Sequence, residues 1–354
     1  MKKLLSLLAA FAYIALASAG IAQAADINFF YPFGAGTIAY VSSTSVAGAL
    51  SMGVQKEIWI NDLVEHIYMT NEWLNKALNH DMFVLDGKVI HVPYAGDKPT
   101  VEKGRTSYPM TVLRRDDTDS TYVLSEFSSS PIAIPDAETV ELSYDKRASV
   151  LMNTKAAMSE VVGHEFLYQW SPTLLAQMQR TTGSNVTAHS TGATGNRKKL
   201  TVADVKAAKK KMNKAGIPAI GRFMILDADM YEQLCDDLIV TQYRDASLVY
   251  DQKNGTLSRI EGFDVYQRAY VMTYTNDTTP VRKYYDAVAS TDDNAAGLCW
   301  YQGGVARAMG THKFFENIGD ATYQADIYSA LIRAGGKKWM HDELGVVALV
   351  QAAG

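Results

Sequence analysis

A short histidine-containing motif is the strongest hint of catalysis in the sequence. His164 and Glu165 begin an H-E-x-x pattern, which zinc metalloproteases complete with a second histidine four residues after the first. Tyr168 occupies that position, so two imidazoles from one helix face cannot share a metal ion here. The seven histidines are scattered along the chain. We therefore predict no metal site at His164.

Other patterns of catalytic residues are incomplete as well. The chain has neither the G-x-S-x-G sequence of serine hydrolases nor the G-K-[ST] ending of a P-loop. Neither Cys235 nor Cys299 has a histidine nearby in sequence that would activate a thiol nucleophile. We interpret three adjacent carboxylate pairs as solvated loop charges: Asp116–Asp117, Asp236–Asp237 and Asp292–Asp293. The sequence thus predicts no catalytic site, no metal site and no cofactor.

Length and composition favour one large domain or a few subdomains. The 354 residues are 47% hydrophobic, which is enough for a substantial core. The formal net charge of -4 does not suggest a nucleic-acid-binding protein. The two cysteines at this spacing form neither a zinc site nor a disulfide framework. Twenty tyrosines and nine prolines are typical of an ordered, strand-rich protein with large contact surfaces.

The N-terminal part of the chain has three regions of different composition. Residues 1–24 resemble a secretory signal peptide, because two lysines precede a long apolar run and an A-x-A sequence. Residues 25–51 are small and polar, and we interpret them as a flexible linker. A helix is predicted over Val54–Met82, within an arm of residues 52–84, because apolar and acidic residues alternate there with a helical period.

Residues 85–142 form an extended passage rich in turns. Strands are predicted at 89–92, 121–127 and 138–142, with prolines and a charged tip between them. A long isolated hairpin is only marginally stable in water, so we expect this passage to need a partner surface. The alternative interpretation is a β-rich subdomain with long surface loops.

The longest helix is predicted from Ser143 or Asp145 to Trp170. At 1.5 Å per residue it would span about 40 Å. Gly163 in its interior would permit a bend, although such a glycine is also merely tolerated in helices. The following residues, Thr181–Lys199, are rich in serine, threonine and glycine, and we interpret them as a mobile surface loop.

The stretch Leu200–Leu238 predicts two helices that flank a buried strand. Lysines on the first helix could attract DNA phosphates, but we interpret them as a solvated face. The predicted parts are a helix capped by Thr201 or Asp204, a turn at Gly216 and Pro218, a strand at Arg222–Leu226, and a helix capped by Asp227 or Asp229.

The C-terminal third of the sequence is strand-rich. We predict a tight turn at Asn254–Gly255, a strand within Ile260–Tyr270 and a strand over Tyr323–Leu331. Gly335–Gly336 is interpreted as a turn, and Gly345–Val350 as a final buried strand. The sequence therefore predicts an α+β protein.

The order of these parts resembles the major capsid proteins of tailed bacteriophages. In that family a helix typically ends in a small-x-Pro-x-x-Gly-Arg turn, which Gly216–Arg222 matches. The sequence Gly262–Arg268 and the Gly-Gly … Gly-Val-Val ending are also similar to the family. The resemblance implies the phage major-capsid fold, with these segments: an N-terminal arm (52–84), an extended β-hairpin loop (85–142), a long spine helix and peripheral domain (143–200), an axial domain (201–310), and closing strands of the peripheral domain (311–354).

The resemblance implies a structural protein rather than an enzyme. The subunit would self-assemble, as hexamers and pentamers, into an icosahedral shell around double-stranded phage DNA, which it would contact non-specifically. Scaffold, portal and maturation protease would be further partners, and the protein would be a virion component assembled in the host cytoplasm. Some capsids of this class join their extended loops through a lysine and an asparagine. Lys98 and Lys103 lie in the corresponding segment, but the sequence identifies no partner for them.

The signal-like residues 1–24 conflict with this interpretation, because a capsid subunit assembles with its genome in the cytoplasm. Either Met52 is the true start, or residues 1–24 tether precursors to the inner membrane, or the capsid interpretation is false. The alternative is a secreted or periplasmic binding protein or hydrolase, exported by residues 1–24. The missing catalytic residues and the extended passage 85–142 weigh against that alternative.

Overall fold

The chain divides into two compact units in the computed structural model, residues 1–62 and 63–354. The described residues belong to the second unit and are 63, 66–67, 71–85, 89–94, 101, 103–104, 106, 118–135, 146–240, 250–251 and 256–354. The signal-like segment, the linker and the beginning of the arm therefore lie outside them. Within the described part, no helix is long and apolar enough to span a membrane.

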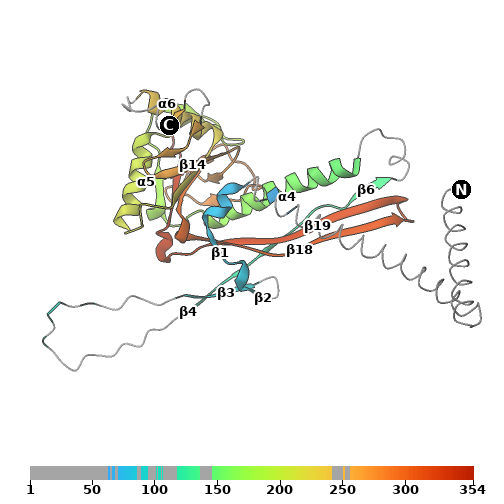
Figure 1. Cartoon of the computed structure of the whole chain (residues 1–354). Coiled ribbons are helices and arrows are strands. Elements are labelled where there is room, and N and C mark those ends of the chain that lie inside the picture. Colours follow the sequence, from blue (N-terminus) through green and yellow to red (C-terminus); the bar gives the residue numbers. More distant parts are fainter. Residues whose placement is uncertain are drawn as a thin grey trace, which may run out of the picture. The chain divides into compact units, whose positions relative to one another are not determined.

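A long β-hairpin is the main element of a five-stranded sheet (Figure 1). It consists of β18 (Val305–Asp320) and β19 (Ala325–Lys338), which pair antiparallel. The short strand β1 (Leu78–Asn79) runs parallel to β18, while β5 (Ser125–Ser128) and β6 (Ile132–Pro135) both pair with β19. Buried residues alternate with partly buried ones along much of β19, as expected for a sheet with one covered face.

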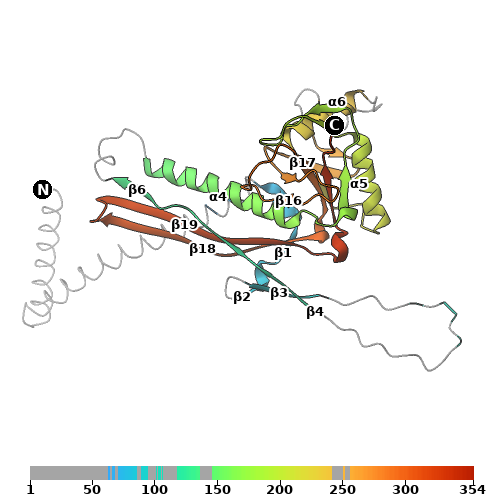
Figure 2. The ribbon, with the colours of Figure 1, turned by 180° about the vertical axis from the view of Figure 1, so that it is seen from behind.

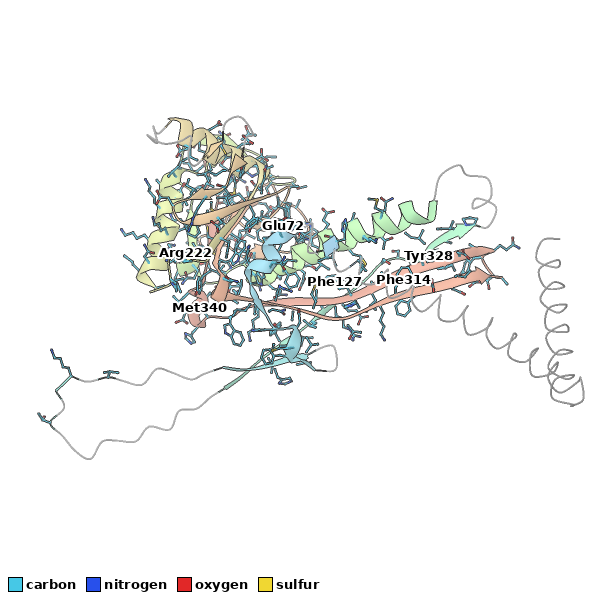
Figure 3. All side chains as sticks on the ribbon, viewed as in Figure 1. Glu72, Phe127, Arg222, Phe314, Tyr328 and Met340 are labelled. Atoms are coloured by element: carbon cyan, nitrogen blue, oxygen red, sulfur yellow. The ribbon has the colours of Figure 1, made fainter. Side chains whose placement is uncertain are left out.

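The long helix α4 (Lys146–Trp170) packs along this hairpin, and it confirms the predicted helix that ends at Trp170. Its C-terminal half is buried, with Phe166 fully enclosed, whereas Met152 near the other end is 67% exposed. Further along the hairpin, Phe314 on β18 and Tyr328 on β19 stack with ring centroids 6.1 Å apart (Figure 3). An aromatic pair thus links the two strands in the part of the hairpin toward its tip.

The predicted turn at Gly335–Gly336 is wrong, because both glycines lie inside β19. A Cβ at Gly336 would lie 2.7 Å from the indole nitrogen of Trp170, and one at Gly335 would lie 3.0 Å from Leu124. The two glycines therefore let neighbouring side chains pack directly against the strand backbone, rather than allowing the chain to turn.

The second main sheet has eight strands and carries two helices. Met224 on β10 is paired with Cys299 on β17, and both belong to the core beneath the helices. The elements are β7 (Met178–Arg180), β10 (Arg222–Asp227), β13 (Arg259–Ile260), β14 (Phe263–Arg268), β15 (Met272–Tyr274), β16 (Arg282–Lys283), β17 (Asn294–Tyr301) and β20 (Val346–Val350), with α5 (Val202–Lys214) and α6 (Ala228–Val240).

The predicted helix–strand–helix unit is confirmed, including its caps. Thr201 and Asp204 form a capping box at the start of α5, in which the Thr201 N–H donates to the Asp204 carboxylate at 3.0 Å. Asp227 caps α6 by accepting a 2.7 Å hydrogen bond from the Met230 N–H. Figures 1 and 2 show α5 on the side of this unit that is remote from α4.

Smaller elements complete the described part. The predicted mobile loop Thr181–Lys199 instead contains a short hairpin, because its backbone groups pair with one another and Arg197 is buried. The smaller strands are β2 (Val84–Leu85), β3 (Val89–Tyr94), β4 (Thr118–Val123), β8 (Asn185–Thr187), β9 (Asn196–Lys198), β11 (Tyr250–Asp251) and β12 (Thr256–Leu257). The 3-10 helices are Glu72–Lys76, Asp81–Phe83, Leu175–Gln177, Gln302–Gly304 and His341–Glu343.

The predicted arm helix of residues 52–84 does not continue through its second half. From Asn71 onward the chain forms two 3-10 turns and the strand β1. The buried Asn71 side chain donates to Ile67 O and to the Ser159 backbone and hydroxyl oxygens at 3.0–3.2 Å. These bonds to α4, together with the pairing of β1, outweigh the helical pattern.

Two further segments differ from the sequence prediction. β20 joins the eight-stranded sheet beside β17, so this part of residues 311–354 does not close the hairpin sheet. The predicted strand 121–127 is interrupted at the buried Leu124, which separates β4 from β5. The predicted strand 138–142 and the turn at Asn254–Gly255 lie outside the described residues.

Candidate functional site

Three tryptophans join the long helix to both sheets. Trp73, just before β1, contacts Trp170 of α4 edge to face with ring centroids 5.3 Å apart. Trp300 of β17 lies 6.3 Å from Trp73 and 5.8 Å from Trp170. All are at most 4% exposed, so this aromatic junction has a large buried apolar area.

Hydrogen bonds fix the orientation of two of these rings. The Trp170 indole N–H donates to Ala306 O at 2.9 Å, which ties α4 to the start of β18. The Trp300 indole N–H donates to Lys76 O at 2.9 Å, which ties the eight-stranded sheet to the segment before β1. The junction therefore has one defined packing arrangement, which fixes α4 against both sheets.

An arginine crosses the long helix at its only interior glycine. Arg268 of β14 donates to Glu160 O at 2.9 Å and approaches His164 Nδ1 at 3.3 Å. A Cβ at Gly163 would lie 2.8 Å from the Arg268 guanidinium and 2.8 Å from the Asn71 amide oxygen. Since α4 is continuous through this residue, Gly163 provides room for a close approach rather than a break in the helix.

We expect Gly163→Ala to destabilise the protein by about 1–3 kcal/mol, as overpacked sites do. At an exposed helix position the same change would stabilise the protein by about 1 kcal/mol. The sign of the stability change therefore distinguishes a close approach from an ordinary helix position. Urea unfolding measures the difference. The double variant Gly163→Ala/Arg268→Ala should lose less stability than the sum of the two single variants, because the added methyl group no longer meets the guanidinium. A gain in stability from the single change would contradict the close approach.

His164 is the histidine of the rejected metalloprotease pattern, and it packs among aromatic rings. Its ring stacks on Tyr285 at 4.8 Å and meets Tyr270 edge to face at 5.2 Å. Burial and the neighbouring Arg268 charge lower the pKa of His164 to about 4. The imidazole is therefore neutral at neutral pH. No group of three potential metal ligands forms among the described residues.

The lowered pKa of His164 predicts a loss of stability on acidification. Below about pH 6.5 the unfolded chain binds a proton at this histidine, whereas the folded protein does so only near about pH 4. Stability should therefore fall across this window. In His164→Phe, which keeps an aromatic ring, the fall in the urea midpoint between about pH 7 and about pH 4.5 should be smaller. An equal fall in both proteins would exclude His164 as the cause.

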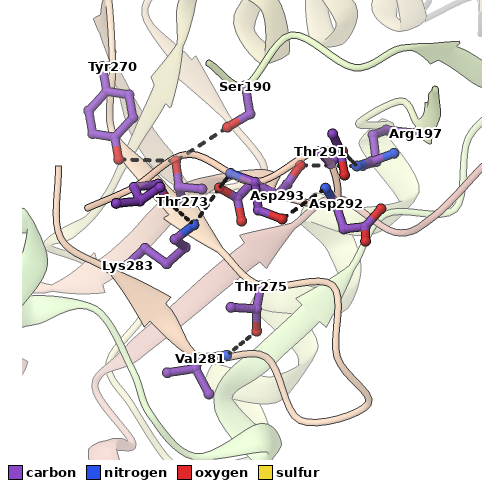
Figure 4. Close-up of polar contacts among 12 residues, drawn as sticks. Ser190, Arg197, Tyr270, Thr273, Thr275, Val281, Lys283, Thr291, Asp292 and Asp293 are labelled. Atoms are coloured by element: carbon purple, nitrogen blue, oxygen red, sulfur yellow. Dashed lines mark hydrogen bonds and ion pairs between the residues drawn. The ribbon is translucent and has the colours of Figure 1, made fainter. Parts of the chain in front are cut away.

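A cavity of about 270 Å³ lies between α4, β15–β16 and the loop before β17. Its wall includes Tyr270, Thr273 and the Lys283–Asp293 ion pair, in which Nζ and Oδ2 are 2.7 Å apart (Figure 4). Tyr270 donates to the Thr273 hydroxyl at 3.0 Å, and Ser190 lies 3.4 Å from the same hydroxyl. These groups satisfy one another, so the wall is fixed rather than poised for proton transfer.

In the part of the chain that the structure describes, His189, Ser190 and the two cysteines do not form a nucleophile–base pair. His189 Nε2 lies 3.0 Å from the Asp227 carboxylate, whereas the neighbouring Ser190 hydroxyl faces Thr273. Burial raises the pKa of the Cys235 thiol to about 11 and also raises the pKa of the enclosed Cys299 thiol. Both thiols are therefore protonated at neutral pH and are poor nucleophiles.

Two of the carboxylate pairs that we interpreted as solvated charges are partly structural. Asp237 is buried in α6 and accepts a 2.9 Å hydrogen bond from the Val202 N–H at the start of α5. Asp293 is buried in its ion pair with Lys283. That interpretation is wrong for these two residues, because the sequence does not show which side of a turn faces the core. Asp116 and Asp117 lie outside the described residues.

Comparison with solved structures identifies the fold. The capsid structure of cyanophage P-SCSP1u has a TM-score of 0.56 and 16% sequence identity, over 77% of this chain and 86% of that chain. The capsid of Ralstonia phage GP4 has a TM-score of 0.55 and 10% identity, over 79% and 87%. A structure of Mycobacterium phage Che8 has a TM-score of 0.51 and 17% identity, over 78% and 89%. No protein-family model and no curated protein matches the chain.

These similarities define the chain as a protein with the fold of phage capsid structures, as predicted from the order of its elements. At such low identity the similarity establishes the fold and not the residues of a site. It gives no support to the alternative of an exported binding protein or hydrolase.

Proposed function

We propose that this chain is a major capsid subunit of a tailed bacteriophage or prophage. One observation carries the proposal: a long hairpin with α4 packed along it is joined to a separate α/β sheet, in an arrangement shared with capsid structures over most of the chain. The function would be structural, namely self-assembly into an icosahedral shell of hexamers and pentamers around double-stranded DNA.

Exposed apolar residues near the hairpin tip support a role in subunit contacts. Phe315, Ile318 and Tyr323 are 48%, 52% and 67% exposed. Exposed apolar side chains that gather at one end of an element favour burial against a partner. In a shell, many such weak contacts would be repeated and would add up by multivalency.

We assign the segments of the chain to the domains of the capsid fold as follows. α4 would be the spine helix, and it would form the peripheral domain together with the hairpin sheet. The eight-stranded sheet with α5 and α6 would be the axial domain, and it would include β20. The passage 85–142 would supply the extended loop, although its strands β5 and β6 belong to the hairpin sheet of their own subunit.

Further partners follow from the same proposal. Scaffold, portal and maturation protease would act on or contact the assembling shell, and packaged DNA would be held by non-specific contact. The subunit would be a virion component assembled in the host cytoplasm. Under this proposal, residues 1–51 would be a segment that is removed during maturation.

Gradient sedimentation tests the proposal. Full-length protein and a version that begins at Met52 should be expressed separately, and at least the shorter one should sediment far ahead of a monomer. Slow sedimentation of both, with the longer one cleaved near Ala24 in the periplasm, would contradict the capsid function and favour an exported protein.

A further inference from the structure

One face of α5 carries a row of exposed lysines. Lys206, Lys210 and Lys214 follow one another at four-residue intervals on its exposed side, and we call them the lysine row. Lys206 is 3.8 Å from the Glu261 carboxylate, but Lys210 and Lys214 form no ion pair with any residue that the structure describes. The one acidic residue of α5, Asp204, is buried in the capping box.

The lysine row is unfavourable for the isolated helix. Like charges four residues apart destabilise a helix, and here they are not alternated with acidic residues. The exposed Ile220, at 83%, follows in the turn after the helix. A basic row beside an exposed apolar side chain is better suited to a protein surface than to DNA alone, because phosphate contacts need only charge.

A surface of opposite charge lies around the cavity beside α4. Glu160 has a side chain that is 72% exposed, and Asp286 and Asp292 are exposed on the loop that precedes β17. Tyr285 and Val288 are 39% and 89% exposed on the same loop. We call these residues the acidic aromatic face: Glu160, Tyr285, Asp286, Val288 and Asp292.

The two basic residues of β16, which precedes this loop, do not cancel this charge at the surface. Lys283 has a side chain that is 18% exposed, and it pairs with the buried Asp293. Arg282 donates to backbone oxygens at the C-terminal end of α4 and stacks over Tyr168, with its guanidinium carbon 4.2 Å from the ring centroid. The exposed charges of the face are therefore negative, and its exposed apolar residues lie among them.

The lysine row and the acidic aromatic face lie on different sides of the eight-stranded unit. α5 packs over β7 and β20, whereas β16 and the loop after it lie at the other end of the strand order. Figures 1 and 2 agree in placing α5 away from α4, which carries Glu160. A closed ring needs two different complementary surfaces on opposite sides of each subunit. Glu232 and Asp236 are exposed acidic residues of α6, which lies in the same layer as α5. They are therefore not on the side opposite the lysine row.

We propose that the lysine row of one copy contacts the acidic aromatic face of the next copy in a head-to-tail ring. This inference rests on the proposed capsid function and specifies which surfaces of neighbouring subunits meet within a hexamer or pentamer. Charge complementarity sets the order of subunits around the ring, and the apolar residues on both surfaces contribute buried area.

Charge reversal of each surface tests the proposal in the full-length chain. Lys210→Glu/Lys214→Glu and, separately, Glu160→Lys/Asp286→Lys should each lower the assembled fraction about tenfold or more, because like charges then face each other. If Glu160→Lys disturbs Arg268, Asp286→Lys/Asp292→Lys reverses the same face from the loop alone. The matched control Glu232→Lys/Asp236→Lys changes the same number of charges on α6 and should assemble normally. Circular dichroism and urea midpoints establish that each variant is folded.

A mixture of the two charge-reversal variants tests directly whether the two surfaces contact each other. Equal amounts should restore rings, because each lysine row then meets a face of opposite charge when the two proteins alternate. Strict alternation closes only rings with an even number of subunits, so hexamers should form and pentamers should not. Electron microscopy would then show sheets or tubes in place of closed shells.

Three outcomes would overturn the proposal. In the first outcome, the mixture contains nothing beyond what each variant forms alone. In the second, either variant assembles like the unaltered protein. In the third outcome, reversal of the lysine row leaves assembly intact and lowers only the DNA content of the particles, which would assign the row to DNA. Failure of the unaltered protein to form any ring, both at full length and from Met52 onward, would count against the capsid function itself, and this separates the two conclusions.

Discussion

Trp170→Ala should destabilise the subunit by about 3–5 kcal/mol, as expected for removal of a fully buried large aromatic side chain. The indole is enclosed by Trp73 and Trp300, and its N–H donates to Ala306 O. Loss of the ring would leave a cavity where α4, the hairpin base and the eight-stranded sheet meet. Since small domains have total stabilities of about 5–15 kcal/mol, a large part of the folded population should be lost at moderate urea concentrations.

Urea unfolding followed by circular dichroism measures this effect. Trp170→Phe retains most of the apolar contact and loses only the hydrogen bond, so it should cost about 1–2 kcal/mol. Trp339→Ala removes the same type of residue at a partly buried position, and it should have a smaller effect than Trp170→Ala. Equal midpoints for Trp170→Ala and the unaltered protein would show that the aromatic junction does not hold the two sheets together.

Arg222→Leu should destabilise the protein by about 3 kcal/mol, because it removes three hydrogen bonds from a charged donor, one of them to the buried Ile217. Arg222 is 2% exposed at the start of β10. Its guanidinium donates to Pro218 O at 2.8 Å, to Ile217 O at 2.7 Å and to the Asn213 side chain at 2.7 Å. The side chain thus closes the turn that joins α5 to β10.

Two further arginine variants make this prediction specific. Arg222→Lys keeps the charge but lacks the planar fork, so its stability should lie between those of the unaltered protein and Arg222→Leu. Arg259→Leu removes a 57% exposed arginine whose ion-pair distance to Asp264 is 3.4 Å, and it should change stability by less than about 1 kcal/mol. Similar unfolding midpoints for Arg222→Leu and Arg259→Leu would show that the Arg222 hydrogen bonds do not stabilise the turn between α5 and β10.

The helix–strand–helix unit could be predicted because its signals are local. Asp227 caps α6 from the adjacent residue, and Pro218 and Gly216 end α5 within a few positions. The strand β10 is buried along its whole length, so an uninterrupted apolar run identified it. These residues set the structure of their own segment, which is the condition under which sequence patterns are reliable.

The sequence predictions are wrong where residues far away in the chain determine the local conformation. Asn71 ends the arm helix through hydrogen bonds to Ser159 on α4, 88 residues later. Gly336 lies in a strand because Trp170 packs onto its backbone. Neither contact leaves a local pattern, and a glycine pair is equally typical of a turn.

The candidate site was only partly accessible from sequence. The H-E-x-x pattern drew attention to His164, and the structure places this residue among the rings of Tyr270 and Tyr285. The aromatic junction was missed, because Trp73, Trp170 and Trp300 are far apart in the chain. The lysines of α5 were visible as a basic face, but the acidic aromatic face is formed by α4 and a loop more than a hundred residues later.

Electron microscopy of sedimented material shows directly whether this chain assembles as a capsid subunit. Cells should express the full chain and, separately, the chain from Met52 onward, and the pellets should be imaged in negative stain. Shells, rings or tubes built of hexamers are expected, at least from the shorter version. A monodisperse monomer from both versions, with no assembled particles at any protein concentration, would contradict the assignment of this chain as a capsid subunit.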